Sequence, residues 1–522
     1  MVYRMEINKA CHALFFMIVS LALWVPSSDA LGARQSYIIY MDKSMMPDHF
    51  SLHQHWYSSM IKEVSGSNSD PTALLYTYDT VTHGFAACLT STEAQAMENM
   101  DGCLSVFQDS TYGLHTTRTP DFLGLSSSHG LWPLSRYGDD IIVGVLDTGI
   151  WPESKSFNDQ GLTPVPARWK GECEVGTEFN ASHCNNKLIG ARYFLKGYEA
   201  KFGRIDEKED YRSPRDADGH GTHTSSIAAG SEVPGSSLLG FATGTARGIA
   251  TKARVAVYKV CWGSCLGSDM LAAMEAAVAD GVDLLSISIA SRAIVPYYDD
   301  MIAIGALGAI QKGVFVSCSA GNEGPIYSAI FNTAPWITTV GASTIDREFP
   351  APVVLGNGQN YRGSSLYKGE PVGNEQLPLV YGKTASRNET ANLCLAGSHD
   401  PKMVSGKIVL CDLGGITAEK ALVVQQAGGA GLILANGPAD GEDLLTECDS
   451  FSSTTVGAKS AEDIKAYINN TRNPRATIKE EGLTVLGKAR APVVAALSSR
   501  GPNPVVPEIL KPDRIAPAST YF

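Results

Sequence analysis

Residues Asp140 to Ile150 read DIIVGVLDTGI, and this stretch decides the fold class. Its apolar run is nearly unbroken and ends in a polar turn, which is typical of a parallel strand buried on both faces. The stretches ARVAVYKVC, VDLLSISIA and VFVSCSAGN repeat the pattern, and SDMLAAMEAAVAD and YYDDMIAIGALGAIQKG between them have helical character. Strands that alternate with helices predict an α/β fold, a parallel sheet with helices on both faces.

Two smaller regions have strand and helix patterns that differ from those of the predicted parallel sheet. Before the sheet, SYIIYMD (Ser36–Asp42) predicts a strand and SLHQHWYSSMIKEV (Ser51–Val64) an amphipathic helix, and further strand and helix patterns complete a compact α+β unit. From about Tyr367 to Gly487, short strands such as the one in GAGLILANG surround helices such as SAEDIKAYINN. Because PVVAALSSRGPNP then resumes the earlier style, we interpret residues 367–487 as an inserted module.

Composition narrows the function classes. A chain of 522 residues with 44% hydrophobic residues is too long for one ordinary core, so we expect a multidomain globular protein. The formal net charge is −12, and no basic stripe is present in the sequence. Because nucleic-acid binding draws on clustered lysine and arginine, we expect no nucleic-acid partner.

The N-terminus predicts secretion. Arg4 and Lys9 precede or flank an apolar run, Ala10–Val25, and small residues follow at Ser28 and Ala30. This is the pattern of a signal peptide cleaved after Ala30. The alternative, a membrane anchor, is less favoured because the run is short for a span and no second long apolar run follows. We therefore expect a secreted, extracellular protein with no stable membrane anchor after cleavage.

Secretion changes how the eleven cysteines are interpreted, because an oxidising compartment favours disulfides. A metal site is the alternative, but the spacings do not form two close cysteine pairs, so no metal and no cofactor is predicted. Three sequons fit a secreted surface. Connectivity is open in the sequence; the candidate pairs are Cys173–Cys184, Cys261–Cys265 and Cys394–Cys411, and the candidate glycosylation sites are Asn180, Asn388 and Asn469.

Three polar residues stand where a parallel sheet gathers its reactive groups, at or beyond the carboxyl ends of strands. Asp147 ends VGVLD, His220 opens a small-residue helix in DGHGTHTSSIAAG, and Asn322 follows VFVSCSAG. Each has a simpler explanation: Asp147 as a turn or cap residue, His220 with His223 as a metal or packing pair, Asn322 as a turn residue. Together, a carboxylate, a histidine and an amide are the parts that orient a base, move a proton and stabilise an oxyanion in acyl transfer.

The motifs around these residues resemble a known family. VGVLDTGIWPESKSF, DGHGTHTSSIAAG, VSCSAGNEGP and LSSRGPNP with ILKPDRIAP closely resemble the subtilisin-like serine proteases, in particular the plant subtilases. The resemblance implies a subtilisin fold in which Asp147 orients His220, His220 acts as general base and then acid, and Asn322 donates to the oxyanion. It also implies a serine endopeptidase that acts on protein or peptide substrates, in the apoplast or cell wall if the source is a plant.

The same resemblance assigns roles along the chain. Residues 31–115, with Tyr37 to His115 as their core, look like an inhibitory propeptide that would bind its own protease, and HTTRTPDFLGL suggests a mature start at Thr116. Residues 116–366 and 488–522 would form the catalytic domain. The inserted module, residues 367–487, looks like a protease-associated domain.

The substrate cleft is mapped in the same way. Ser288-Ile289-Ala290 and Ser319-Ala320-Gly321 match the two family segments that flank the substrate backbone. The family usually has glycine at the position of Ala290. A Cβ there is expected to crowd the substrate.

The nucleophile is missing from the pattern. In the family it lies in a Gly-Thr-Ser-Met motif beyond a Pro-Asp-x-x-Ala-Pro-Gly segment, and here PDRIAPA (Pro512–Ala518) is followed by four residues. The stretch GTAR (Gly244–Arg247) lacks the serine, and Ser498, Ser499 and Ser519 are not expected to replace it. We expect a C-terminally truncated subtilase, inactive as it stands. The alternative is a non-catalytic secreted protein that acts as a protease inhibitor or binding module through its propeptide or inserted module.

Overall fold

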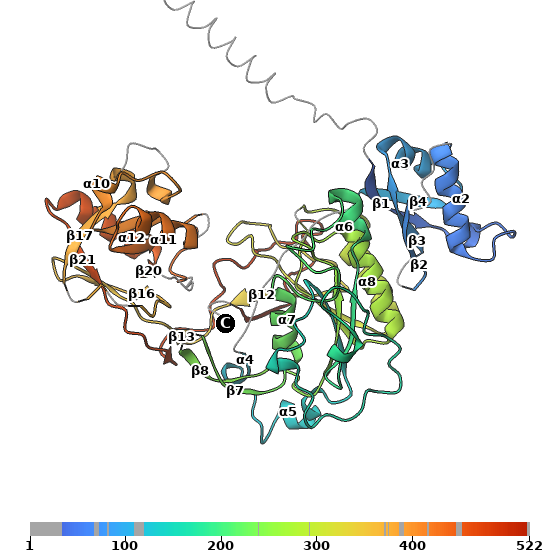
Figure 1. Cartoon of the computed structure of the whole chain (residues 1–522), viewed down its shortest axis with the longest axis horizontal. Helices are drawn as coiled ribbons and strands as arrows, with labels where there is room; N and C mark the ends of the chain where they lie inside the picture. The colour runs from blue at the N-terminus through green and yellow to red at the C-terminus, as the bar shows by residue number, and fades with distance from the viewer. Residues whose placement is uncertain are drawn as a thin grey trace, which may run out of the picture. The chain divides into compact units, whose positions relative to one another are not determined.

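The computed structural model describes residues 34–66, 73–80, 83–108, 119–238, 240–291, 293–369, 372–373, 375–385, 391–414, 417–444 and 451–518. The chain divides into two compact units. The first ends at Asp109 and also includes Lys196–Arg204, and the second contains the rest. Figure 1 labels the elements of both units. The predicted signal peptide and the predicted mature start at Thr116 lie outside the described residues.

The first unit is a four-stranded antiparallel sheet in the order β2-β3-β1-β4, with helices packed against it. Trp56 and Tyr57 of α2 and Met97 of α3 bury their side chains in one core with Ile39 and Phe85 of the sheet. The predicted α+β unit is therefore confirmed. Its elements are β1 (Gln35–Met41), α2 (His53–Ser65), β2 (Leu74–Tyr78), β3 (Gly84–Leu89), α3 (Ser91–Glu98), β4 (Cys103–Gln108) and α6 (Lys196–Phe202).

The second unit contains a seven-stranded sheet in the order β23-β12-β11-β10-β5-β9-β6, in which every pairing is parallel. The strand that decided the fold class is β5, and all of its residues are buried. The chain winds from β5 towards β6 and later towards β10, so the winding reverses beside β5. The strands are β5 (Ile142–Asp147), β6 (Leu188–Tyr193), β9 (Arg254–Lys259), β10 (Leu284–Ile287), β11 (Phe315–Ser319), β12 (Thr338–Ser343) and β23 (Arg514–Pro517).

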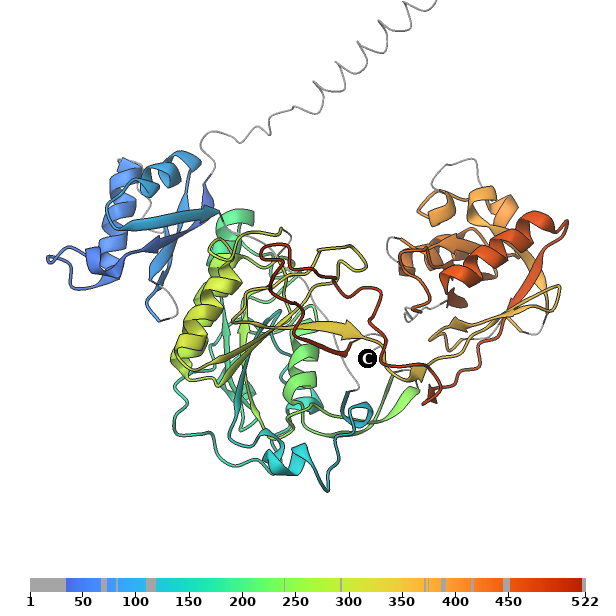
Figure 2. The ribbon, with the colours of Figure 1, turned by 180° about the vertical axis from the view of Figure 1, so that it is seen from behind.

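Helices cover both faces of this sheet. Val143 and Val145 of β5 share a core with Ala229 of α7. On α9, Gly305 leaves no room for a Cβ beside Met274 of α8, so these two helices pack closely. Figures 1 and 2 show α7 and α8 on opposite sides of the strands, which confirms the predicted α/β architecture. The helices are α7 (His220–Ala229), α8 (Gly267–Asp280) and α9 (Met301–Gln311).

A second sheet of eight strands, in the order β15-β14-β21-β17-β18-β19-β20-β16, lies within residues 353–478. From here on, the name inserted module refers to residues 353–478. The sequence places the start of the module at residue 367, whereas three short strands before that residue already belong to its sheet. The elements are β14 (Val353–Leu355), β15 (Asn360–Tyr361), β16 (Gly363–Ser364), β17 (Leu377–Tyr381), α10 (Pro401–Val404), β18 (Ile408–Asp412), α11 (Thr417–Gln426), β19 (Gly431–Ala435), β20 (Ser453–Val456), α12 (Ala458–Asn470) and β21 (Arg475–Ile478).

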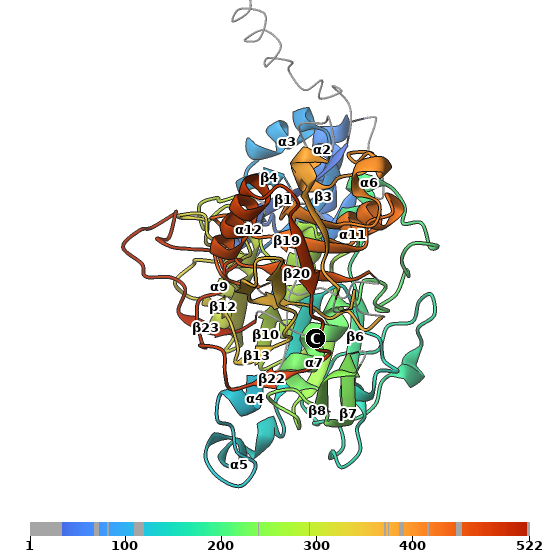
Figure 3. The ribbon, with the colours of Figure 1, turned by 90° about the vertical axis from the view of Figure 1, so that its left-hand side faces the viewer.

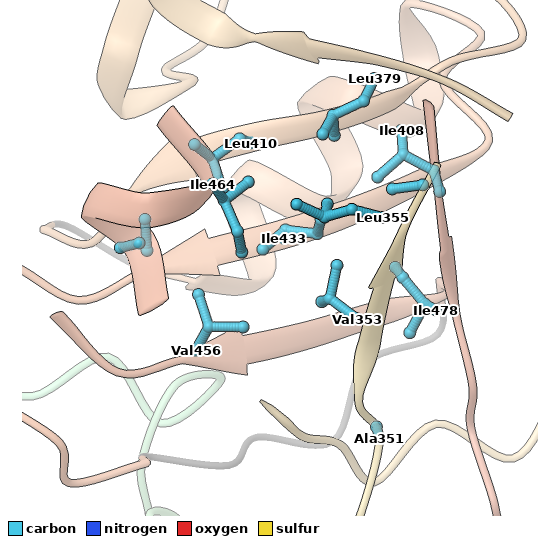
Figure 4. Packing of buried hydrophobic residues seen from close by; sticks show 13 residues of the cluster. Ala351, Val353, Leu355, Leu379, Ile408, Leu410, Ile433, Val456, Ile464 and Ile478 are labelled. Carbon is cyan, nitrogen blue, oxygen red and sulfur yellow. The ribbon is translucent and has the colours of Figure 1, made fainter. Parts of the chain in front are cut away.

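The inserted module has two cores, one on each face of its parallel strands. Ile408 and Leu410 of β18 pack with Ile464 of α12, and Figure 4 shows these side chains together. The residues between them on the strand point the other way, where Val409 packs with Val424 of α11. Figure 3 accordingly shows α11 and α12 on opposite sides of β19.

Shorter elements and cross-links complete the second unit. The structure contains all three disulfides that the sequence predicts: Cys173–Cys184, Cys261–Cys265 and Cys394–Cys411. Among the described helices, none combines the length and the apolar character needed to cross a membrane. The remaining elements are α4 (Thr119–Phe122), α5 (Leu131–Leu134), the pair β7 (Val233–Leu238) and β8 (Phe241–Ala246), and the pair β13 (Arg347–Glu348) and β22 (Val485–Leu486).

Candidate active site

The strand register brings three predicted segments to one edge of the seven-stranded sheet. Leu146 of β5 pairs with Ile287 of β10, and Ile287 pairs with Cys318 of β11. The residues that directly follow Leu146, Ile287 and Cys318 in the chain are Asp147, Ser288 and Ser319, respectively. These three positions meet at the carboxyl edge, beside β5, which is where open α/β sheets bind ligands.

Asp147 and His220 form a hydrogen-bonded pair at this edge. The distance from Oδ1 of Asp147 to Nδ1 of His220 is 2.7 Å, and the Asp147 side chain is fully buried. Oδ1 of Asp147 also accepts from the backbone N of Thr148 at 2.7 Å, and Oδ2 accepts from Oγ1 of Thr224 at 3.0 Å. A carboxylate can only accept, so Nδ1 of His220 is the donor and Nε2 carries the lone pair of the imidazole.

The start of α7 places His220 beside Asp147. The N-cap residue is Gly219, whose φ of 103° lies in the left-handed region that glycine adopts without strain. Gly221 donates its backbone N–H to Oγ1 of Thr148 at 2.7 Å. A Cβ on Gly221 would overlap the carbonyl oxygen of Gly149, so the helix packs directly on the turn after β5.

Asp216, which the sequence analysis did not single out, organises the loop before His220. Its buried carboxylate accepts from the backbone N of Gly219 at 2.8 Å and from the N and Oγ1 of Thr222 at 2.9 and 2.6 Å. Thr222 Oγ1 in turn accepts from the backbone N of Trp151 at 2.9 Å. An aspartate between arginine and alanine in a polar loop has no periodic signal, so the pattern of the sequence could not indicate this role.

A pocket of about 250 Å³ lies at the carboxyl edge of the sheet. Thr224 and Ala228 of α7 line one side of it, and Ala516 of β23 lines another. Four of the six predicted substrate-binding residues and the predicted oxyanion donor also line it: Ser288, Ser319, Ala320, Gly321 and Asn322.

The other two predicted substrate residues, Ile289 and Ala290, do not line this pocket. Ile289 is fully buried, and its carbonyl oxygen accepts from Nδ2 of Asn332 at 2.9 Å. The same Nδ2 donates to the carbonyl oxygen of Ser319 at 2.8 Å. Asn332 thus connects the two segments that the sequence places on either side of a substrate, a role that no motif in the sequence signalled.

Ser498 and Ser499 are buried and bind backbone groups. Oγ of Ser498 accepts from the backbone N of Ala342 at 3.0 Å, and Oγ of Ser499 accepts from the N of Glu323 at 3.0 Å. These contacts support structural roles for both hydroxyls. Ser519 lies outside the described residues.

Comparison with protein families identifies the chain. The model of the subtilase family matches residues 138–521, which include Asp147, His220 and Asn322. The chain belongs to the subtilase family. Residues 36–115 match the peptidase inhibitor I9 family, so this subtilase has a propeptide domain of that family before its sheet.

Comparison with curated proteins finds relatives of the same family. The chain is 52% identical to subtilisin-like protease SBT1.7 and 50% identical to subtilisin-like protease SBT1.6, both of Arabidopsis thaliana. The alignments cover 96% and 94% of this chain but 66% and 64% of those relatives, so the chain spans less than two thirds of their length. The crystal structure of fervidolysin from Fervidobacterium pennivorans matches with 14% identity and a TM-score of 0.36, covering 61% of this chain and 44% of that one.

The second histidine of this subtilase helix, His223, has a different environment from His220. Burial, with a smaller contribution from His220, lowers the pKa of His223 to about 4. Neither histidine belongs to a group of three or more potential metal ligands among the described residues.

The sequons that fall within the described residues of the subtilase lie at its surface. Asn180 is exposed at the N-cap of a short 3₁₀ helix, where its Oδ1 accepts from the N of Ser182 at 3.0 Å. Asn469 is exposed in the last turn of α12. Asn388 lies outside the described residues. Exposure at Asn180 and Asn469 is compatible with the predicted glycosylation.

Proposed function

We propose that this chain carries the acid–base and oxyanion parts of a secreted serine endopeptidase that hydrolyses peptide bonds in proteins or peptides. The observation that carries the proposal is the 2.7 Å contact between Oδ1 of Asp147 and Nδ1 of His220, at the sheet edge where Asn322 lines a pocket. Membership of the subtilase family supports the reaction class.

The proposed proton transfers follow from the hydrogen bond. Asp147 holds the Nδ1–H of His220, so Nε2 is the atom that accepts the proton of a nucleophilic hydroxyl. The imidazolium that forms is stabilised by the buried carboxylate. It then donates the proton to the amine that leaves when the peptide bond breaks.

Asn322 is the proposed oxyanion donor. Attack on a peptide carbonyl places negative charge on its oxygen, and an amide N–H that is already in position stabilises this charge. Removing one such donor from an acyl-transfer site lowers kcat by about 10² to 10³. The pocket beside Asn322, lined by Ser288 and Ser319, is the proposed position of the substrate residue before the scissile bond.

The nucleophile is the part that these 522 residues lack, because none of their serines lies in the family's Gly-Thr-Ser motif. Loss of the nucleophile costs on the order of 10⁶ in kcat in a bacterial subtilisin. We therefore propose that the chain by itself does not hydrolyse peptide bonds. The catalytic roles proposed for His220, Asp147 and Asn322 apply to a polypeptide that also supplies the serine.

A fluorophosphonate probe tests both statements. The purified chain should not be labelled, whereas a fusion that adds the remaining length of a matched Arabidopsis relative should be labelled and should cleave casein. His220→Ala in the fusion should abolish both. His183→Ala, at a partly exposed histidine of the 3₁₀ helix Ala181–His183, outside the pocket, serves as the matched control. A serine labelled in the unfused chain, or full activity of the His220→Ala fusion, would refute the proposal.

A second function has one observation in its favour. Residues 36–115 match a peptidase inhibitor family, and the described part of them forms a unit with its own core. This unit could inhibit an intact subtilase without any catalysis by the chain. Residues 34–115 should then inhibit an active subtilase at micromolar concentration, and lack of inhibition at that concentration would count against this function.

A further inference from the structure

The inserted module contains a cluster of three side chains with metal-binding atoms: Cys394, His399 and Cys411. One ligand atom from each lies within 4.8 Å of the others, and this is the sole group of three or more His, Cys, Asp or Glu that meets this criterion in the described part of the chain. Both cysteines are fully buried and are joined in a disulfide. The cluster lies away from the predicted active-site residues in sequence and does not enter the proposed mechanism.

The three residues come from two segments of the module. Cys394 and His399 lie in the loop between residues 391 and 400, which leads into α10, and Cys411 lies on β18. A third segment closes the cluster at Gly382. A Cβ there would lie 2.9 Å from Sγ of Cys394 and 3.4 Å from Cε1 of His399, so the glycine leaves room for both side chains.

The disulfide alone does not account for His399. Nδ1 and Nε2 of His399 are both buried, and neither has a hydrogen-bond partner. Leaving a buried polar atom unsatisfied costs about 1–3 kcal/mol, so such a group calls for a specific explanation. An imidazole nitrogen within 4.8 Å of two sulfur atoms provides the donor set that zinc prefers, because thiolate and imidazole are its common protein ligands.

We propose that the Cys394–Cys411 disulfide, once reduced, becomes a zinc site made of the two cysteine sulfurs and one ring nitrogen of His399. Three protein ligands leave the fourth position of tetrahedral zinc open to water. The cysteine spacing predicts no metal, because no two close cysteine pairs are present, whereas in this cluster the histidine supplies the third ligand. The disulfide and the zinc ion are thus alternative cross-links between the same loop and β18.

Conversion of the disulfide form into the zinc form requires reduction of the disulfide and then binding of the metal. A dithiol reductant supplies two electrons and two protons, the bond between the two Sγ atoms breaks, and the reductant becomes a cyclic disulfide. The zinc ion then displaces the two thiol protons and binds the thiolates. In a reducing environment, the metal would hold the loop at residues 391–400 in place of the covalent bond.

Cobalt is the probe for the test, because Co²⁺ bound by thiolates absorbs in the near ultraviolet and, in tetrahedral sites, in the visible range. The full chain is reduced with a phosphine under anaerobic conditions and titrated with Co²⁺ and then Zn²⁺. We expect both absorption bands, their loss on addition of zinc, and one zinc bound per chain at this site. Cys411→Ser should abolish the bands, and His399→Gln should weaken zinc binding by at least about tenfold.

The variant with Cys173→Ser and Cys184→Ser is the matched control, because it removes a different disulfide and should keep the spectrum. Thermal unfolding of the reduced chain with and without zinc covers the case in which a substitution impairs folding. Zinc should raise the unfolding temperature of the reduced wild type and not that of the Cys411→Ser variant. The proposal is overturned if reduced wild type binds Co²⁺ no better than Cys411→Ser, if His399→Gln leaves the affinity unchanged, or if zinc leaves the wild-type unfolding temperature unchanged.

Discussion

The carboxylate of Asp216 accepts two hydrogen bonds from Thr222, one from its backbone N at 2.9 Å and one from its Oγ1 at 2.6 Å. This contact ties the loop before His220 to the first turn of α7. The orientation of the histidine therefore depends on a residue four positions before it, as well as on Asp147. Loss of Asp216 should loosen the helix start without removing either member of the Asp147–His220 pair.

We predict that Asp216→Ala lowers the free energy of unfolding by about 3 kcal/mol, because several hydrogen bonds to a buried charged group are lost together. Urea unfolding followed by circular dichroism measures this change. Asp218→Ala is the matched control: Asp218 is exposed and accepts one bond, from the N of His220 at 3.3 Å, so its loss should cost about 0.5 kcal/mol. Equal stability losses in the two variants would contradict the role assigned to Asp216.

Asn332 offers a second test, because its left-handed backbone, with a φ of 54°, and the hydrogen bonds of its Nδ2 affect the free energy of unfolding separately. Asn332→Gly relieves the backbone but removes the donor to Ile289 and Ser319, and should cost about 1–2 kcal/mol. Asn332→Ala adds the cost of a left-handed backbone and should cost about 1 kcal/mol more. The order of stability, measured in urea, should be wild type, glycine variant, alanine variant; a glycine variant as stable as wild type would show that the two hydrogen bonds contribute nothing.

The packing of α7 on the turn after β5 predicts that a single methyl group at Gly221 is destabilising. Gly221→Ala should lower the free energy of unfolding by about 1–3 kcal/mol, because the Cβ overlaps the backbone of Gly149 and forces the helix outward. Gly244→Ala is the control, since a Cβ at Gly244 meets nothing within 4 Å. Thermal unfolding compares the two, and a Gly221→Ala midpoint equal to that of Gly244→Ala would rule out the close approach.

Lys187 is fully buried, and its Nζ donates to the carbonyl oxygens of Thr251 and Ala253 at 2.8 and 2.7 Å. Burial, with a smaller contribution from Arg254, lowers the pKa of Lys187 to about 7, against an ordinary value of 10.5. Between these two pH values the unfolded chain binds more protons at this position than the folded chain. The contribution of Lys187 to the free energy of unfolding therefore rises with pH from about 7 to about 10.5.

Lys187→Met should remove this pH dependence. The difference in unfolding free energy between wild type and Lys187→Met should grow in favour of the wild type by up to about 1.4 kcal/mol per pH unit between pH 7 and pH 9. Urea unfolding at pH 7, 8 and 9 measures the difference at each pH. The unfolding free energy of Lys252→Met, at an exposed lysine, should change with pH as that of the wild type does. The same pH dependence in Lys187→Met as in the wild type would contradict the lowered pKa of Lys187.

Much of the fold could be predicted because buried strands carry long apolar runs. The strands β5, β9, β10 and β11 and the helix α9 lie within stretches that the sequence predicts, and α8 begins one residue before its predicted stretch. The predicted partners Asp147 and His220 also meet in the structure, because Asp147 ends a recognisable strand and His220 opens a recognisable helix. The strands β14, β15 and β16, by contrast, are two or three residues long, too short to show a period of two.

The residues that the sequence did not reveal act through the backbone of other segments. Asp216 accepts mainly from backbone N–H groups and Asn332 donates to carbonyl oxygens. Nearly every residue has these groups, so no partner residue type appears in the sequence to indicate the contacts. The assignment of Lys196–Arg204 to the first unit was likewise not expected, because α6 interrupts the sequence of the second unit. The contacts of Asp216 and Asn332 and the placement of Lys196–Arg204 all depend on which segments come close together in the folded chain.

The parallel pairing of β23 with β12 places β23 at the margin of the seven-stranded sheet. No further strand of the described residues pairs with its outer side, so β23 is an edge strand within the described part of the chain. Ile515, which is 47% exposed, adds apolar surface to this margin, while Arg514 and Pro517 are residues of the kinds that discourage such pairing. Self-association of the purified chain is therefore expected to begin at β23, and added charge on this strand is the direct way to keep the protein soluble.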